Sequence, residues 1–79
     1  MVKKITIYTT PACVYCRMAK AFFDARGISF EEKNVLRDAV ARAEMINKSG
    51  ARAVPVIDVD GEILVGFHRE RLREIFGEA

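Results

Sequence analysis

The sequence has no tryptophan, one histidine, two prolines and only two cysteines among its 79 residues. No stretch approaches the roughly 20 consecutive apolar residues that span a bilayer. The first ten residues lack the apolar core and the small-residue cleavage site of a secretory signal peptide. We therefore expect a cytoplasmic protein without membrane association, in a compartment where structural disulfides are uncommon.

An excess of one charge is also missing. Thirteen basic and eleven acidic residues give a net charge of +2, and no run of lysine or arginine occurs. This balance argues against a nucleic-acid partner, which a clustered basic surface would attract. A hydrophobic content of 51% is typical of a folded chain rather than a disordered one. The length predicts a single domain over residues 1–79, which we expect to be a monomer.

The pattern of apolar and turn-forming residues predicts the order β-α-β-α-β-β-α. Strands are expected at residues 3–8, 28–35, 54–59 and 63–65, and helices at residues 14–26, 38–48 and 69–76. Asp38 is a candidate helix cap, Gly27 and Gly50 are candidate helix ends, and Asp60-Gly61 is a two-residue turn signal. The first βαβ unit predicts two parallel strands, and the hairpin adds two antiparallel ones. The fold class is therefore α/β, with a four-stranded mixed sheet and helices on both faces.

Helical spacing predicts which side chains each helix buries. On the first helix the apolar stripe comprises Tyr15, Met18, Ala19, Phe22 and Phe23, and Tyr15 is expected to be partly exposed beside Cys13. The second helix is expected to bury Ala39, Ala43 and Ile46, and the third Leu72, Ile75 and Phe76. The carboxylates of the hairpin, Asp58 and Asp60, are expected to be exposed. Tyr8 precedes the two cysteines in the sequence, and Tyr15 lies between them.

Both cysteines lie in one short motif, Cys13-Val14-Tyr15-Cys16. A structural bridge here closes a very short loop, which constrains the unfolded chain little. A closed zinc site needs four ligands, and beyond this pair the chain offers no further cysteine and only the distant His68. A zinc ion or iron–sulfur cluster held between two chains remains the alternative to a working redox pair.

The position of Cys13 favours the redox interpretation. It falls where the first strand ends and a helix begins, and the unpaired N–H groups of a helix N-terminus favour a thiolate over a thiol. Cys13 would attack a disulfide and form a mixed disulfide, which Cys16, one turn along, would resolve. A CxxC motif beside a βαβ pattern in a cytosolic protein is typical of a thioredoxin-like redox motif.

Five motifs also resemble those of the glutaredoxins, in the same order along the whole chain. They are Tyr8-Thr9-Thr10, Cys13-Val14-Tyr15-Cys16, Ala53-Val54-Pro55, Asp60-Gly61 and Val65-Gly66-Phe67. The resemblance implies a thioredoxin/glutaredoxin fold and a thiol–disulfide oxidoreductase that reduces protein disulfides without a tightly bound cofactor. Cys13 and Cys16 would be its catalytic residues, and no residue would be a metal ligand.

The resemblance also implies a set of substrate- or glutathione-binding residues. These are Tyr15, Arg52, Val54, Pro55, Gly66 and Phe67. Val54 would offer its N–H and C=O to the substrate backbone beside a cis Pro55, whereas the residues alone allow Pro55 simply to open an edge strand. Arg52 is either a partner for a glutathione carboxylate or a solvated loop charge.

Three positions depart from the common glutaredoxin pattern. Val14 replaces a proline, Thr10 stands where many members have a lysine or arginine, and Phe67 replaces the second glycine of a glutathione-binding segment. Gly66-Phe67 instead resembles NrdH-type redoxins, which thioredoxin reductase reduces and which donate electrons to ribonucleotide reductase. The chain is also similar to short glutaredoxin-like proteins of the YruB type. Two electron donors are therefore considered, glutathione as a co-substrate and thioredoxin reductase, and the departures favour the second.

Overall fold

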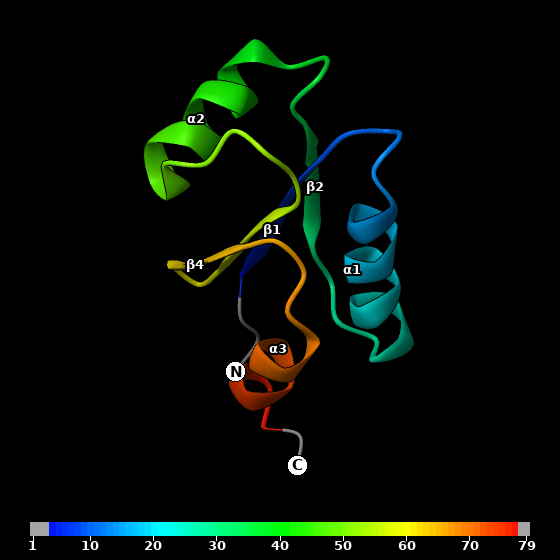
Figure 1. The fold of residues 1–79 in the computed structure, drawn as a ribbon. Coiled ribbons are helices and arrows are strands. Elements are labelled where there is room, and N and C mark those ends of the chain that lie inside the picture. The colour runs from blue at the N-terminus through cyan, green and yellow to red at the C-terminus, as the bar shows by residue number, and fades with distance from the viewer. Residues whose placement is uncertain (1–3, 78–79) are drawn as a thin grey trace.

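The computed structural model describes residues 4–77. Along the chain lie β1 (Ile5–Thr9), α1 (Val14–Ala25), β2 (Glu31–Asn34), α2 (Ala39–Ser49), β3 (Val56–Val59), β4 (Glu62–Val65) and α3 (Arg69–Ile75) (Figure 1). The predicted order of elements is confirmed. Strand β2 is shorter than expected, and Ile28 and Phe30 lie before it, where they pack as partly buried side chains on the core.

The four strands form one mixed sheet in the order β2-β1-β3-β4. Strand β1 pairs with β2 in parallel and with β3 antiparallel, and β4 pairs antiparallel with β3. All five residues of β1 are buried, which suits its central place in the sheet. The charged sequence of β2 suits an edge, where one side of the strand meets water.

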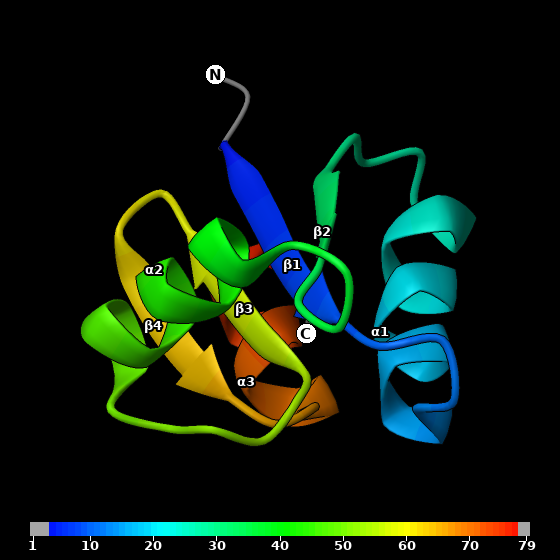
Figure 2. The same cartoon turned by 90° about the horizontal axis from the view of Figure 1, so that it is seen from above.

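Helices cover both faces of the sheet, as predicted. Figure 2 shows α2 in front of the sheet and α3 behind it. Because side chains alternate along a strand, Ile5 and Ile7 face α1 and α3, whereas Tyr8 faces α2. The larger core lies on the α1 and α3 face and contains Ile5, Ile7, Ala19, Phe22, Phe23, Ile57, Val59, Leu64 and Leu72. The smaller core lies under α2 and contains Tyr8, Val35, Ala41, Met45 and Val56.

The buried face of α1 differs from the predicted one. The helix buries Ala19, Phe22 and Phe23, as predicted, and Cys16 as well. Met18 is 37% exposed, and Tyr15, which was expected to be partly exposed, is 61% exposed. The side chains nearest the sheet follow the spacing of Cys16, Ala19 and Phe23, so the stripe begins one residue later than predicted. This rotation buries one thiol and leaves an aromatic ring exposed one residue before it.

The prediction for α2 was wrong at two of its three residues. The helix buries Ala41 and Met45, while Ala39 and Ala43 are exposed. Ile46 is partly buried and packs against the smaller core, as predicted.

The predicted helix and turn signals are confirmed. The Asp38 carboxylate accepts hydrogen bonds from the N–H groups of Val40 and Ala41, each at 3.0 Å, and so caps α2. Gly50 ends that helix in the left-handed conformation, with φ of 72°. Positive φ values at Asp60 and Gly61 form the two-residue turn between β3 and β4. Among the described residues, no helix is both long enough and apolar enough to cross a bilayer.

Candidate active site

Cys13 occupies the N-cap of α1. Its backbone is extended there, and its Sγ accepts a hydrogen bond from the Cys16 N–H at 3.1 Å. No acidic residue lies in the first turn of the helix to oppose a negative sulfur. The sulfur of Cys13 therefore satisfies one of the backbone N–H groups that the start of α1 leaves unpaired. Cys13 is also partly exposed.

Cys16 has the opposite environment. Its side chain is fully buried, and burial together with the hydrogen bond to Cys13 raises the pKa of the Cys16 thiol from 9.0 to about 12. Both cysteines are free thiols in this structure. The pair is therefore asymmetric: one sulfur is accessible and held by a helix N-terminus, and the other is enclosed and remains protonated at neutral pH.

A second segment, the loop before β3, approaches Cys13. The Cys13 thiol lies 3.9 Å from the carbonyl oxygen of Val54, and the Val54–Pro55 peptide bond is cis, as the family resemblance implies. The Pro55 carbonyl in turn accepts a hydrogen bond from the Gly66 N–H at 2.8 Å. The structure thus joins the start of α1, the loop before β3 and the loop after β4 into one site.

The loop after β4 is closely packed at Gly66. This residue has φ of 89°, in the region that favours glycine, and the His68 ring folds back over it. The ring Nε2 of His68 lies 2.7 Å from the Val65 carbonyl oxygen, to which it donates. A Cβ added at Gly66 would lie 3.3 Å from that Nε2.

The remaining predicted binding residues surround this site in different ways. Tyr15 is exposed in the first turn of α1, and Arg52 is exposed in the loop that leads to Val54. Phe67 is partly buried and packs its ring against Phe22, with ring centroids 6.2 Å apart. Phe67 therefore contributes to the larger core, and the substrate-binding role of all three residues stays a prediction.

Tyr8 does not belong to the thiol site. Its side chain is fully buried on the α2 face, where its hydroxyl donates to Glu44 and accepts from Lys48 at 3.0 Å. Burial, followed by the hydrogen bond to Glu44, raises the pKa of Tyr8. The sequence signal for this placement is the alternation of side chains along a strand, which puts Tyr8 on the opposite face of the sheet from Ile5 and Ile7.

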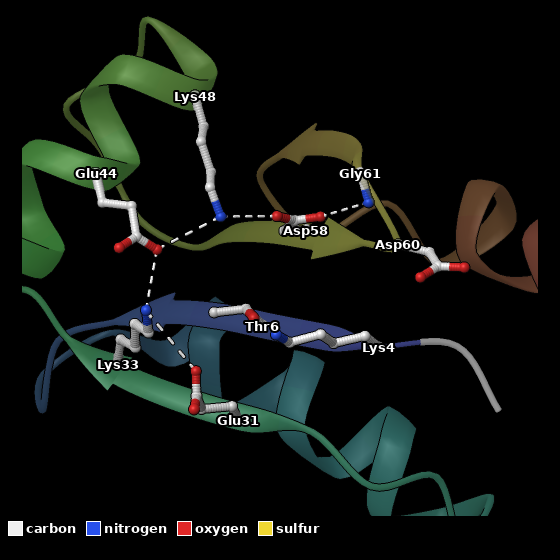
Figure 3. A pocket seen from close by; sticks show the side chains of 9 residues that line it. All are labelled: Lys4, Thr6, Glu31, Lys33, Glu44, Lys48, Asp58, Asp60 and Gly61. Carbon is white, nitrogen blue, oxygen red and sulfur yellow. Dashed lines mark hydrogen bonds and ion pairs between the residues drawn. The ribbon is translucent and has the colours of Figure 1, made fainter.

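Tyr8 leads instead to a network of ion pairs between α2 and the sheet (Figure 3). Glu44 pairs with Lys33 at 3.0 Å and with Lys48 at 3.4 Å, and Lys48 pairs with Asp58 at 2.9 Å. Hydrogen bonds from Tyr8 and then Lys33 lower the pKa of Glu44 to about 2. Asp58 was expected to be exposed but is partly buried by this pairing.

The network lines a cavity of about 210 Å³. Its charged side chains come from Lys4 just before β1, from β2 and α2, and from the β3–β4 hairpin, and those of Glu31, Lys33, Glu44, Lys48 and Asp58 form ion pairs. Neither cysteine lines this cavity. We assign it a structural role, in which it fixes α2 to three strands of the sheet.

Metal ligation was the alternative use of the cysteines. Within residues 4–77, no group of three or more histidine, cysteine, aspartate or glutamate side chains is arranged to hold a metal ion. A site shared between two chains would take ligands from both, so that alternative stays untested.

Comparisons with known proteins give consistent matches. The family model described as glutaredoxin matches residues 5–64. The chain is 38% identical over 71 residues to an uncharacterised glutaredoxin-like 8.6 kDa protein in the rubredoxin operon of Clostridium pasteurianum, covering 90% of this chain and 95% of that one. It is 40% identical over 62 residues to glutaredoxin 3 of Escherichia coli K12, covering 78% and 75%. The crystal structure of a mutant of the thioredoxin-like protein BC3987 superposes with a TM-score of 0.89 at 30% identity, covering 96% and 97%.

Proposed function

The chain belongs to the glutaredoxin family of thiol–disulfide oxidoreductases, and we propose that it is a small dithiol electron carrier that reduces protein disulfides through Cys13 and Cys16. The observation that carries this proposal is the asymmetry of the two sulfurs. Cys13 accepts a helix N–H at 3.1 Å and is accessible, whereas Cys16 is buried with a raised pKa.

The cycle follows from that asymmetry. The Cys13 thiolate attacks one sulfur of a substrate disulfide, which forms a mixed disulfide and releases the other substrate sulfur as a thiolate. Cys16 then loses its proton and attacks the Cys13 sulfur, which forms the Cys13–Cys16 disulfide and releases the second substrate thiolate. Two electrons pass to the substrate, whose sulfurs take up two protons, and the carrier is left oxidised.

Substrate positioning is proposed for the backbone of Val54. Its carbonyl oxygen is 3.9 Å from the Cys13 thiol, so a substrate strand that pairs with Val54 brings its own cysteine to the attacking sulfur. Main-chain pairing of this kind accepts many side chains. A protein substrate is therefore consistent with the site.

We further propose thioredoxin reductase as the electron donor rather than glutathione. The loop at Gly66 and Phe67 supports this choice. The Gly66 N–H is taken by the Pro55 carbonyl, His68 covers Gly66, and Phe67 packs its ring on Phe22. Little backbone is left open where the family resemblance places the γ-glutamyl end of glutathione, and Thr10 supplies no charge for a carboxylate.

A test of the electron donor examines both the proposed dithiol cycle and the proposed donor. NADPH consumption is followed with a protein disulfide substrate such as insulin, in the presence of either thioredoxin reductase or glutathione plus glutathione reductase. We expect turnover with thioredoxin reductase and little with glutathione. The turnover of Cys13→Ser is compared with that of Cys16→Ser, so that loss of the attacking sulfur can be distinguished from loss of the resolving sulfur.

The outcomes are distinct. Turnover only with glutathione would overturn the proposed donor and leave the dithiol cycle intact. Activity of the Cys13→Ser variant in either system would overturn the assignment of Cys13 as the nucleophile. Absence of turnover in both systems, together with metal content and a doubled molecular mass, would favour the metal-binding alternative.

A further inference from the structure

Four connecting segments meet at one end of the sheet. The strand register places Thr9 beside Asn34, Tyr8 beside Val56, and Val56 beside Val65. The chain therefore leaves β1, β2 and β4, and enters β3, at the same end, which the two ribbon views allow the reader to follow (Figures 1 and 2). We call this the thiol end and define it as residues 10–17, 35–38, 50–55 and 66–68, which include both cysteines.

The net charge of the protein lies at the thiol end. Its charged residues are Arg17, Arg37, Arg52 and Asp38. The whole sequence holds 13 basic and 11 acidic residues, so ten of each remain outside the thiol end and cancel. The Asp38 carboxylate accepts two N–H groups of α2, where the helix N-terminus offsets its charge.

The three arginines of the thiol end have no acidic partner among the described residues. None of them forms an ion pair with another residue in the range 4–77. Three lysines are arranged differently, because Lys20, Lys33 and Lys48 each pair with a carboxylate. Positive charge is therefore available to a partner at the thiol end.

Contacts of neighbouring residues indicate where Arg17 and Arg37 lie. Lys20 reaches the edge strand β2 through its ion pair with Glu32 at 2.9 Å. Arg17 lies three residues before Lys20 on α1 and so shares that side of the helix. The loop that follows β2 carries Arg37, and its backbone is fixed because the Asn34 side chain accepts hydrogen bonds from the N–H groups of Leu36 and Arg37.

Exposed apolar side chains gather at the same end. Six large hydrophobic side chains are exposed among residues 4–77, and every one lies within the thiol end or no more than two residues from it. They are Val14, Tyr15, Met18, Leu36, Val40 and Val65. Single exposed hydrophobic residues are ordinary on a protein surface, and here all of them lie at the end of the sheet that also holds the unpaired arginines.

We propose that the thiol end is a docking surface for a partner protein whose disulfide lies in an acidic segment with apolar side chains. This inference rests on the proposed function, because it names the kind of substrate that the same site accepts. Carboxylates beside the partner's disulfide face Arg17, Arg37 and Arg52. Apolar side chains of the partner cover Leu36 and Tyr15. A basic segment meets repulsion at the same place, so charge selects among disulfides that are otherwise equally reactive.

The test uses two synthetic peptides, each with one intramolecular disulfide flanked by two leucines. One peptide carries glutamates beside the disulfide, the other carries lysines at the same positions, and they are otherwise identical. The rate constant for reduction by the pre-reduced protein is measured at about 0.01 M and about 1 M ionic strength, where the Debye length is about 30 Å and about 3 Å. Each rate is divided by that of reduction by uncharged dithiothreitol, which removes differences in the peptides' own reactivity.

We expect faster reduction of the glutamate peptide at low salt and loss of that preference at high salt. Arg17→Gln and Arg37→Gln should each slow the glutamate peptide about 1.5- to 5-fold, as for single exposed charge contacts. The matched control is Lys4→Gln, which removes one charge at the opposite end of β1 and should change both rates less than either arginine substitution does. Leu36→Ser should slow both leucine-containing peptides, while a small uncharged disulfide is reduced at the wild-type rate by every variant.

Four results would be decisive against these claims. Equal rates for the two peptides at low salt, or an equal loss in Lys4→Gln and Arg37→Gln, would overturn the docking surface. A preference that persists at high salt would overturn the electrostatic basis of recognition. Failure to reduce even the small disulfide would instead overturn the proposed function, so the two failures are distinguishable.

Discussion

The sulfur of Cys13 and the carbonyl oxygen of Val54 lie 3.9 Å apart, although the two residues are 41 positions apart in the sequence. The contact joins the start of α1 to the loop before β3. It places the Cys13 sulfur beside the backbone of Val54, and the buried Cys16 lies one turn further along α1. In the cycle that we propose, attack, resolution and substrate alignment therefore all take place around the Cys13 sulfur.

Replacing the resolving cysteine should stop the cycle halfway. In Cys16→Ser, the mixed disulfide on Cys13 has no internal thiol to release it, so a substrate adduct should accumulate in a one-to-one ratio. Intact-mass spectrometry without a reductant measures the adduct, and reduction should remove it. Cys13→Ser is the matched control and should carry none. An adduct on Cys16 in that control would mean that the buried sulfur reaches substrates by itself.

The raised pKa of Cys16 predicts how stability depends on pH in the reduced protein. The folded state holds this proton up to about pH 12, whereas the unfolded chain releases it near pH 9.0. Between these values the unfolded state binds fewer protons, so the free energy of unfolding should fall as pH rises, with the full contribution present below about pH 9.

Urea unfolding at several alkaline pH values measures that slope. Cys16→Ala should reduce it, because the variant has no buried thiol to keep protonated. The oxidised protein should lack it as well, since its sulfurs form a disulfide and do not titrate. An unchanged slope in Cys16→Ala would show that another group, such as Tyr8 with its raised pKa, produces the alkaline loss.

The sequence predicted the framework of the site well because its signals are local. The position of Cys13 at the start of a helix, the cap at Asp38 and the turn at Asp60 each depend on a few neighbouring residues. The family resemblance added the cis peptide bond before Pro55, which no local pattern requires. The substrate roles of Arg52 and the other binding residues remain predictions.

The errors arose where tertiary packing selects among several apolar side chains. Tyr15 and Met18 fit a helical stripe as well as Cys16 and Ala19 do, and only the approach of α1 to the sheet decides between them. The ion-pair network had no sequence signal, because its members come from different elements and are far apart along the chain. Asp58 was expected to be exposed, and its ion pair with Lys48 of α2 partly buries it instead.

The network around Glu44 predicts acid sensitivity. Hydrogen bonds from Tyr8 and Lys33 lower the pKa of Glu44 to about 2, from an ordinary value of 4.5. A lowered pKa in the folded state contributes stability above about pH 4.5, and that contribution should be lost as pH falls toward 2. Glu44→Gln should flatten this part of the stability profile, measured by urea unfolding between pH 2 and 7.

A matched control and a direct titration sharpen that prediction. Asp24→Asn removes an exposed carboxylate that forms no ion pair within residues 4–77, and it should change the acid profile less than Glu44→Gln. Tyr8→Phe should raise the pKa of Glu44, followed by the NMR shift of its side-chain carboxyl carbon. If Tyr8→Phe leaves that pKa unchanged, the lysines rather than the hydroxyl hold Glu44 ionised.

Gly66 is the position where the backbone of the site tolerates least change. Its φ of 89° lies in the region that side chains with a Cβ avoid, so Gly66→Ala should lower the free energy of unfolding by about 1–2 kcal/mol. The hydrogen bond from Gly66 to Pro55 holds the loop opposite Cys13, so reduction of protein disulfides should slow as well. The double variant Gly66→Ala/His68→Ala separates the two causes, because the added Cβ lies 3.3 Å from the His68 ring. If backbone conformation dominates, removing the ring should recover little stability; full recovery in the double variant would assign the loss to the contact with His68.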